Sequence, residues 1–365
     1  MLYVLKTVPG LEDLLAEECK SVEPNCEPLR EERGRLLVEL SREGAEKLVQ
    51  ISRLLTSAYE VLAETELVSL SPEGVRSVAL EIEWERILHD GAIFAVRSER
   101  VGEHSFTSLD VSREVGRAVF ERCASRGVHV KVHLNAPEVV VIAELFGSRL
   151  TIGVSLTGDS SLHRRWYRVR EHPASLKPPI AFAMIMLSGM RDGELLIDPM
   201  CGGGTIPIEA LLYFETSRAV CGDVSEESLR IAKHNAAAAG VLERLETLRS
   251  DVRDLPSLLG RRIAKRIVTN PPYGIRLGTP RASAYSLAKL FDASNELLTE
   301  DGSLVLITPS RKRALEEAER IGMRLYCERE VLHGDLRAWI LCFESSSLAT
   351  RNNSPLRAED QRSAW

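Results

Sequence analysis

Between residues 176 and 345 the sequence alternates short apolar runs with longer stretches of helical spacing, and this alternation constrains the fold most strongly. The runs ELLIDPM and RAVCGDV have the length of strands, and stretches such as SEESLRIAKHNAAAAG repeat apolar residues every three or four positions. Strands that alternate with helices form a parallel, doubly wound α/β sheet. The last two strand-like runs, RLYCEREVLH and LRAWILCFE, have no helix between them and predict a hairpin at one edge.

The preceding part of the chain predicts two smaller α+β modules. Residues 1–58 read as strand, helix, strand and helix, and residues 59–157 continue with further strands and two helices. One of these helices is expected to begin at Ser71 as the N-cap, with Pro72 in its first turn. The other is expected to end at Gly127.

Two polar segments complete the predicted organisation. Residues 158–175 are basic and lack periodicity, so they are predicted to form a linker before the α/β domain at 176–345. Residues 346–365 have the composition of a disordered tail. Although the formal net charge is −6, nucleic acid responds to local patches rather than to the total. The linker supplies candidate phosphate contacts, although an ordinary solvated linker explains them equally well: Arg164, Arg165 and Arg168.

Cysteine content and hydropathy indicate the cellular compartment of the protein. The seven cysteines include no Cys-x-x-Cys pair, which predicts reduced thiols and argues against a disulfide framework or a zinc site. The longest apolar run is too short to span a bilayer. We therefore expect a cytoplasmic protein that holds no metal and does not associate with membranes.

A glycine-rich turn follows the first strand of the α/β domain in the stretch LLIDPMCGGGTIPIEA. Gly202, Gly203 and Gly204 allow positive φ and a close approach of backbone to a ligand at the carboxyl ends of the strands. The dinucleotide fingerprint G-x-G-x-x-G is absent, and the carboxylate of Asp198 suits a cationic ligand better than a phosphate. Taken alone, an ordinary tight turn explains these glycines about as well.

Acidic residues follow the next two strands. Asp223 lies about 20 residues after the glycines, where a carboxylate can accept both ribose hydroxyls. Its alternative role is to cap the next helix, but Ser225 can do that and leave Asp223 free. Asp251 is placed to accept the exocyclic amine of an adenine, with capping or solvation as the alternative. Three carboxylates at three successive strand ends favour a binding site over coincidence.

The fourth strand ends in Asn-Pro-Pro-Tyr, residues 270–273. Neither proline has an N–H to donate, and the residue before each proline is held extended. The Asn270 side chain and the Pro271 carbonyl could accept the two hydrogens of an exocyclic amine as positive charge develops on its nitrogen. Tyr273 could stack on the base. The alternative is a strand terminator followed by a packed ring.

Together these motifs resemble those of class I S-adenosylmethionine-dependent methyltransferases. The resemblance implies catalytic roles for Asn270, Pro271, Pro272 and Tyr273. It also implies that the segment before the first catalytic strand covers the methionine end of the cofactor, although Lys177 could equally be a solvated residue at a helix start. The implied cofactor-binding residues are Ser175, Leu176, Lys177, Asp198, Cys201, Gly202, Gly203, Gly204, Thr205, Asp223, Asp251, Val252 and Asn270.

The N-terminal half resembles the THUMP-containing tRNA guanine-N2 methyltransferases of the archaeal and bacterial TrmN group. The stretches FAVRSERVGEHSFTSLDVSREVGRAV and SSLHRRWYRVREHPASLKPPIA carry the likeness, although Trp166 stands where relatives often have glycine. The resemblance implies a ferredoxin-like module at 1–58, a THUMP domain at 59–157 that grips the tRNA acceptor end, and a monomeric enzyme. Arg97 and Arg100 are further implied RNA contacts.

The same resemblance implies N2-methylguanosine at tRNA position 6 as the product. Asn270 favours this over the position-ten branch, for which an Asp-Pro-Pro-Tyr motif would be expected. Methylation of tRNA position 10 or of ribosomal RNA is the alternative. A remoter alternative is a THUMP protein that binds RNA without catalysis.

Overall fold

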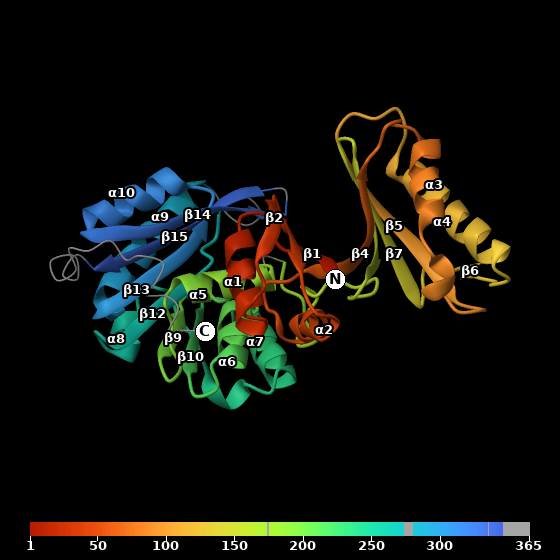
Figure 1. The fold of residues 1–365 in the computed structure, drawn as a ribbon. Coiled ribbons are helices and arrows are strands. Elements are labelled where there is room, and N and C mark those ends of the chain that lie inside the picture. Colours follow the sequence, from red (N-terminus) through yellow and green to blue (C-terminus); the bar gives the residue numbers. More distant parts are fainter. Residues whose placement is uncertain (174, 274–279, 335, 346–365) are drawn as a thin grey trace. The chain divides into compact units, whose positions relative to one another are not determined.

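The computed structural model describes residues 1–173, 175–273, 280–334 and 336–345 (Figure 1). The chain forms two compact units. Unit 1 comprises Met1–Thr7 and Ala16–Leu162, and unit 2 comprises Val8–Leu15 and His163–Trp365.

Unit 1 begins with a ferredoxin-like arrangement. Its elements are β1 (Leu2–Lys6), α1 (Glu12–Val22), β2 (Pro28–Glu32), β3 (Arg35–Glu39), α2 (Arg42–Ile51) and β4 (Ser57–Glu66). The strands pair antiparallel in the order β2-β3-β1-β4, as the β-α-β-β-α-β connection requires. Strand β2 was not predicted, because its sequence PLREE is mostly charged and lies at the edge of the sheet.

The second half of unit 1 extends the same sheet. Its elements are α3 (Pro72–Glu81), the 3₁₀ turn η1 (Trp84–Arg86), β5 (Ile93–Val101), α4 (Ser108–Ser125), β6 (Lys131–Val132), β7 (Val139–Phe146) and β8 (Arg149–Ser155). The sheet continues as β4-β8-β7-β5-β6, and α3 and α4 cover one face of it (Figure 1). Ser71 caps α3 by accepting from the Gly74 N–H at 3.2 Å, and Pro72 occupies the first turn, so the predicted helix start is confirmed.

Strand β4 belongs to both halves of unit 1. It pairs with β1 on one side and with β8 on the other, so eight strands form one continuous sheet. The predicted boundary between residues 58 and 59 falls within the first residues of this strand.

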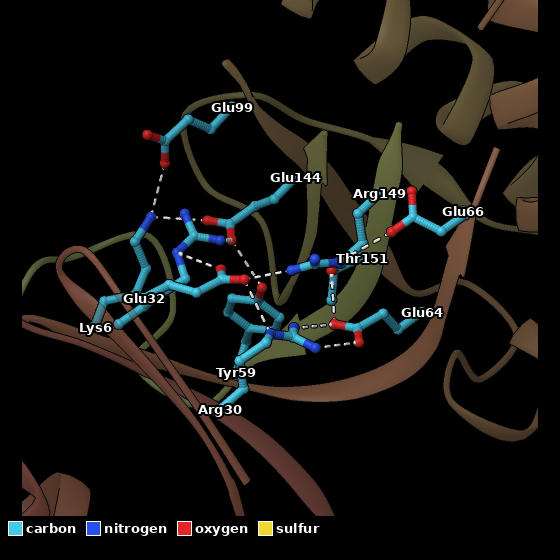
Figure 2. A network of polar contacts seen from close by, with 11 residues as sticks. Lys6, Arg30, Glu32, Tyr59, Glu64, Glu66, Glu99, Glu144, Arg149 and Thr151 are labelled. Carbon is cyan, nitrogen blue, oxygen red and sulfur yellow. Dashed lines mark hydrogen bonds and ion pairs between the residues drawn. The ribbon is translucent and has the colours of Figure 1, made fainter. Parts of the chain in front are cut away.

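A buried carboxylate ties the two halves together on the sheet face opposite α3 and α4 (Figure 2). Glu144 of β7 is 1% exposed and accepts from Lys6 Nζ at 2.8 Å and from Arg35 Nη1 at 2.7 Å. The Tyr59 hydroxyl donates to the same carboxylate at 2.8 Å. A buried charge is tolerated only when it is paired and hydrogen-bonded, and Glu144 meets both conditions.

The cysteine prediction was wrong in one respect. Cys19 and Cys26 form a disulfide with their Cα atoms 6.0 Å apart, which lies within the usual range. The chain turns back after α1 through a bond from the Cys26 N–H to the Glu23 carbonyl, which brings the two thiols together. An odd number of cysteines does not exclude one such pair, so the inference of wholly reduced thiols does not hold.

Unit 2 contains the doubly wound sheet. Its elements are α5 (Pro178–Leu187), β9 (Leu195–Asp198), α6 (Thr205–Tyr213), β10 (Arg218–Asp223), α7 (Glu226–Ala238), η2 (Leu242–Arg244), β11 (Leu245–Arg249), α8 (Leu255–Leu259), β12 (Ala264–Thr269), α9 (Pro280–Leu297), β13 (Leu298–Thr308), α10 (Arg311–Arg320), β14 (Met323–His333) and β15 (Leu336–Ser345). The strand order is β11-β10-β9-β12-β13-β15-β14.

The predicted parallel sheet and edge hairpin are confirmed. Strands β9 to β13 pair in parallel, whereas β15 runs antiparallel to both β13 and β14. Helices α8, α9 and α10 pack their apolar residues into one core with the sheet, and α5 and α6 pack together on the other face (Figure 1). No helix among the described residues is both long enough and apolar enough to cross a membrane.

The Val8–Leu15 segment completes unit 2 beside strand β14. Arg329 donates to the Gly10 carbonyl at 2.7 Å and forms an ion pair with Asp13. Gly10 has a φ of 98°, and a Cβ there would lie 2.1 Å from the Glu330 carbonyl oxygen. Only glycine can occupy this position without displacing β14.

Candidate active site

The predicted motifs meet at one edge of the sheet in unit 2. Asp198 and Asp223 end β9 and β10, while Asp251 and Asn270 follow β11 and β12. These four strands are neighbours in the order β11-β10-β9-β12 and run parallel, so their carboxyl ends lie side by side. This is the edge at which α/β sheets bind ligands.

The glycine turn has the backbone geometry that its sequence predicts. Gly202 and Gly204 have positive φ values of 51° and 79°, and Gly204 is the N-cap of α6. A Cβ on Gly204 would lie 2.9 Å from the Cβ of Ala232, so a larger residue would push α7 away. Cys201 and Thr205 flank the turn and are buried.

Asp223 holds the glycine turn in place. Its Oδ2 accepts from the Gly202 N–H at 3.0 Å, and its Oδ1 accepts from the Ser225 N–H at 2.8 Å. Ser225 caps α7 as predicted, accepting from Ser228, but Asp223 is not left free by this arrangement. A carboxylate offers about four lone-pair sites, so two remain for the hydroxyls of a ligand.

Asp198 lies beneath the turn rather than on its surface. It is 1% exposed and accepts from the Thr269 hydroxyl at 2.7 Å and from the Met200 N–H at 3.2 Å. Burial raises the pKa of Asp198 to about 7. Because Thr269 immediately precedes Asn270, this carboxyl group links the base of the glycine turn to the strand that carries the NPPY motif.

Asp251 forms a local ion pair. Both of its oxygens accept from Arg253, at 2.9 Å and 3.1 Å, and these hydrogen bonds lower the pKa of Asp251. Val252, the residue between them, is 7% exposed. The adenine-side acceptor expected at this strand end is therefore already occupied in part by a cation.

The NPPY motif is internally hydrogen-bonded. The Tyr273 hydroxyl donates to Asn270 Oδ1 at 2.5 Å, and burial raises the pKa of Tyr273. Pro271 is buried and Pro272 is exposed. The sequence predicted a tyrosine stacked on a base, and the structure adds a bond from its hydroxyl to the proposed catalytic amide.

The predicted linker lies against unit 2. Arg165 Nε and the Tyr167 hydroxyl both bind the fully buried Glu209, at 3.0 Å and 2.7 Å. The Arg168 side chain is 12% exposed and lies 3.5 Å from Glu171, whereas Arg164 is exposed. The polar sequence suggested a solvated segment because the partners of its arginines could not be identified from the pattern.

Two residues that the sequence reasoning missed hold this segment over the glycine turn. A Cβ on Gly203 would lie 3.0 Å from the Cβ of His172, and His172 Nε2 lies 3.3 Å from the Ser228 hydroxyl. Asn235 bonds to both backbone groups of Arg170, at 3.0 Å and 3.1 Å, and to the Gly203 carbonyl at 3.2 Å. No local sequence signal connects residues so far apart in the chain.

The segment continues into the predicted methionine-end residues. The Ser175 N–H donates to the His172 carbonyl at 3.0 Å, which places Ser175 beside the turn. Leu176 is 3% exposed, and Lys177 is the N-cap of α5 without a side-chain capping bond. Ser175 therefore lies near the glycine turn, and the cofactor-binding role of Ser175, Leu176 and Lys177 stays a prediction.

The predicted RNA contacts in unit 1 have local partners. Arg97 binds Asp159 through two bonds of 2.7 Å and 2.5 Å. Arg100 donates to the Gly102 carbonyl at 3.0 Å and lies 2.8 Å from His104 Nδ1. Within the described residues, no group of three or more His, Cys, Asp or Glu side chains is arranged to hold a metal ion.

The fold and these strand-end motifs define a class I methyltransferase domain preceded by a separate α+β domain. A family model described as "RMKL-like, methyltransferase domain" matches residues 165–338, and a THUMP domain model matches residues 72–155. A tRNA (guanine(6)-N2)-methyltransferase from Archaeoglobus fulgidus is 34% identical over 361 residues, which cover 92% of this chain and 90% of that protein.

The crystal structure of TrmN from Thermus thermophilus superposes with a TM-score of 0.78 at 29% identity, covering 94% of this chain and all of that one. A ribosomal RNA large subunit methyltransferase K/L from Alteromonas mediterranea is 27% identical and matches 75% of this chain but only 44% of its own length. The chain therefore belongs to the family of THUMP-containing methyltransferases that includes the tRNA (guanine(6)-N2)-methyltransferases. It is an enzyme of the methyltransferase class.

Proposed function

We propose that this enzyme transfers a methyl group from S-adenosylmethionine to the N2 amine of a guanine in tRNA, at position 6 of the acceptor stem. The product is N2-methylguanosine. The placement of Asn270 directly after β12, the strand that neighbours β9 and its glycine turn, carries the proposal because it supports an amide acceptor beside the proposed cofactor site. The activity for which the Archaeoglobus fulgidus relative is named supports the choice of guanine N2 and position 6.

The strand-end residues suit the proposed cofactor. The glycine turn allows close backbone approach, and Asp223 retains lone pairs for two ribose hydroxyls while it fixes that turn. His172 and Ser175 lie beside Gly203, where the methionine end of the cofactor is proposed to bind. When bound, the cofactor supplies an electrophilic methyl group.

The protein's contribution to the reaction is the orientation of a weak nucleophile. The lone pair of the guanine amine is delocalised into the ring, so acceptors that favour a pyramidal nitrogen lower the barrier. Asn270 Oδ1 binds the Tyr273 hydroxyl through one lone pair and has a second for an amine hydrogen. The Pro271 carbonyl is proposed to accept the other hydrogen. As the nitrogen–methyl bond forms, the amine loses one proton to solvent, so no strong base is required.

The proposed substrate is tested by mapping methylation on RNA. A tRNA transcript and a 23S ribosomal RNA fragment are incubated with the full chain and labelled cofactor, and nuclease digestion with mass spectrometry locates the modified nucleotide. Labelling at position 6 of the tRNA alone is expected. Exclusive labelling of tRNA position 10 would favour the position-ten alternative instead. Exclusive labelling of the ribosomal fragment would favour the ribosomal RNA alternative, which is the activity for which the Alteromonas mediterranea relative is named.

Asn270→Ala is the matched variant for the proposed catalytic role. Because Asn270 is proposed to act on the amine, cofactor and tRNA affinities should stay close to wild type while methyl transfer at saturation falls steeply. Preserved turnover with a loss confined to cofactor binding contradicts this role. Tyr273→Phe removes only the hydroxyl donor at Asn270 and should cost much less turnover than Asn270→Ala.

A further inference from the structure

Trp166 is an exposed tryptophan on the segment that covers the glycine turn. Its side chain is 61% exposed, whereas Trp84 in unit 1 is fully buried. Isolated exposed apolar residues are common on protein surfaces and need no special explanation. Trp166 differs because of how rigidly it is held and because of the charges around it.

The backbone on both sides of Trp166 is anchored. Arg165 and Tyr167 both bind the buried carboxylate of Glu209, and Arg170 is fixed by Asn235. The Tyr167 ring lies edge-on to the indole, with 5.5 Å between centroids and a 75° interplanar angle. The ring is therefore presented by a fixed support, so little conformational entropy would be lost when a ligand binds it.

Positively charged residues flank Trp166 in the sequence and surround the nearby His163. Desolvation lowers the pKa of His163, and the charges of Lys177, Arg164, Arg168 and Arg165 lower it further, which places all of them near one imidazole. The segment from 163 to 177 carries five Arg or Lys residues. Arg165 and Arg168 pair with Glu209 and Glu171, whereas Arg164 and Arg170 are exposed. Arg164 is exposed, so its guanidinium can contact a ligand that also reaches Trp166.

A flat, supported aromatic face within a cationic patch suits single-stranded nucleic acid. Base–aromatic stacking uses the ring, and phosphate groups use the cations. An acidic peptide would use the cations but has no need of a supported indole. We infer that Trp166 is a stacking platform for an unpaired nucleotide of the RNA substrate, with Arg164 on the adjoining phosphate.

This inference rests on the proposed function for the identity of the RNA, but not on the methylated position. The inference also predicts that Trp166 binds single-stranded RNA in preference to duplex RNA, because a base inside a duplex has no free face to stack on an external ring. The contact is therefore expected with an unpaired nucleotide of the RNA, and not with paired stem residues.

Photocrosslinking to the full chain tests the platform. The probe is a single-stranded oligouridylate of roughly ten nucleotides, within the span of single-strand binding surfaces, that carries 4-thiouridine. A hairpin with 4-thiouridine in its stem is the duplex probe. Mass spectrometry should place the single-strand crosslink on the peptide that contains Trp166, and the hairpin stem should give little crosslink there.

The variants separate stacking from charge and from folding. Trp166→Ala should abolish that crosslink and weaken oligouridylate binding by about 5- to 100-fold, the scale of one lost stack, whereas Trp166→Phe should keep most of both. Arg164→Gln should reduce the salt dependence of binding by about one phosphate contact while the crosslink stays on Trp166. Val169→Ser, at a neighbouring position that is 59% exposed, should bind like wild type with an unchanged Tm.

Methylation of tRNA is measured in parallel so that the two proposals can fail separately. If Trp166→Ala crosslinks and binds like wild type, or if the hairpin stem crosslinks equally well at Trp166, the platform is wrong whether or not tRNA is methylated. If Trp166 shows the expected crosslink but no guanine N2 methylation occurs on tRNA, the platform stands and the proposed function fails.

Discussion

At the scale of single residues, the carboxylate of Asp223 has two tasks: it fixes the Gly202 N–H and is proposed to bind the cofactor ribose. Asp223→Asn should weaken S-adenosylmethionine binding by about 1.5–3 kcal/mol, the scale of a hydrogen bond to a charged group. Calorimetry of the full chain measures this loss. Glu226→Gln changes an exposed carboxylate near the start of α7 and should leave the affinity unchanged. Equal affinities of wild type and Asp223→Asn for S-adenosylmethionine would contradict the proposal that Asp223 binds the cofactor ribose.

The raised pKa of Asp198 predicts how the stability of the folded protein depends on pH. Its pKa is about 7 in the folded protein, against 3.8 for an unperturbed aspartate, so the folded state keeps a proton that the unfolded chain releases. Below about pH 4 both states are protonated, and as pH rises from there to 7 this group progressively destabilises the folded protein. Asp198→Asn retains an acceptor for Thr269 and removes the titration.

Thermal unfolding measures this effect. Between pH 5 and pH 7.5 the Tm of wild type should fall relative to that of Asp198→Asn. Curves that run parallel over this range would mean that Asp198 is ionised throughout. S-adenosylmethionine is proposed to bind at the turn, where its sulfonium charge would favour the ionised carboxylate, so saturating cofactor should reduce the difference.

At the scale of elements, the segment expected to be a linker depends on a buried ion pair with α6. Glu209→Gln would leave the Arg165 guanidinium, 14% exposed, without its carboxylate. Breaking such a buried pair costs about 3–5 kcal/mol. Urea unfolding of the full chain should show that loss, while Glu227→Gln, which breaks an exposed pair with Arg230, should cost less than about 1 kcal/mol. Similar losses for both variants would show that Glu209 does not anchor the segment.

The contacts of residues 163–177 could not be predicted from the sequence, whereas most strands of unit 2 could. Strands such as β9 and β12 were predictable because hydrophobic periodicity is local, and three of the strand-end acids followed from their spacing. Strand β2 was missed because its residues are charged, and α8 was missed because five residues show no helical period. The bonds from Tyr167 to Glu209 and from Arg170 to Asn235 join residues 42 and 65 positions apart, which no periodicity can reveal.

At the scale of the whole molecule, guanine selection is proposed to depend on a fixed distance from the tRNA acceptor end held by THUMP. A guanine in a stem must leave its stack to reach a buried methyl donor, which costs a few kcal/mol, so position rather than sequence is expected to guide it. Lengthening the acceptor stem by one base pair should move the modified nucleotide or abolish modification. Mass mapping of wild-type and lengthened transcripts measures this outcome.

Modification of the same numbered nucleotide, despite the added pair, would contradict the distance rule. Deleting residues 1–157 is a poor test of it, because the deletion also removes Val8–Leu15 from unit 2. Such a truncation would leave Arg329 without Asp13 and the Gly10 carbonyl. Lost activity in the truncated chain would therefore not distinguish lost RNA binding from a damaged catalytic unit.

The Arg329–Asp13 ion pair also has a consequence for biosynthesis. Its partners are 316 positions apart, so the ribosome must translate nearly the whole described chain before the pair can form. Until then the nascent Val8–Leu15 segment cannot occupy its place beside β14, even though it is synthesised well before that strand. The catalytic unit can therefore be completed only after β14 has been synthesised, and until then its Val8–Leu15 segment lacks its native partner.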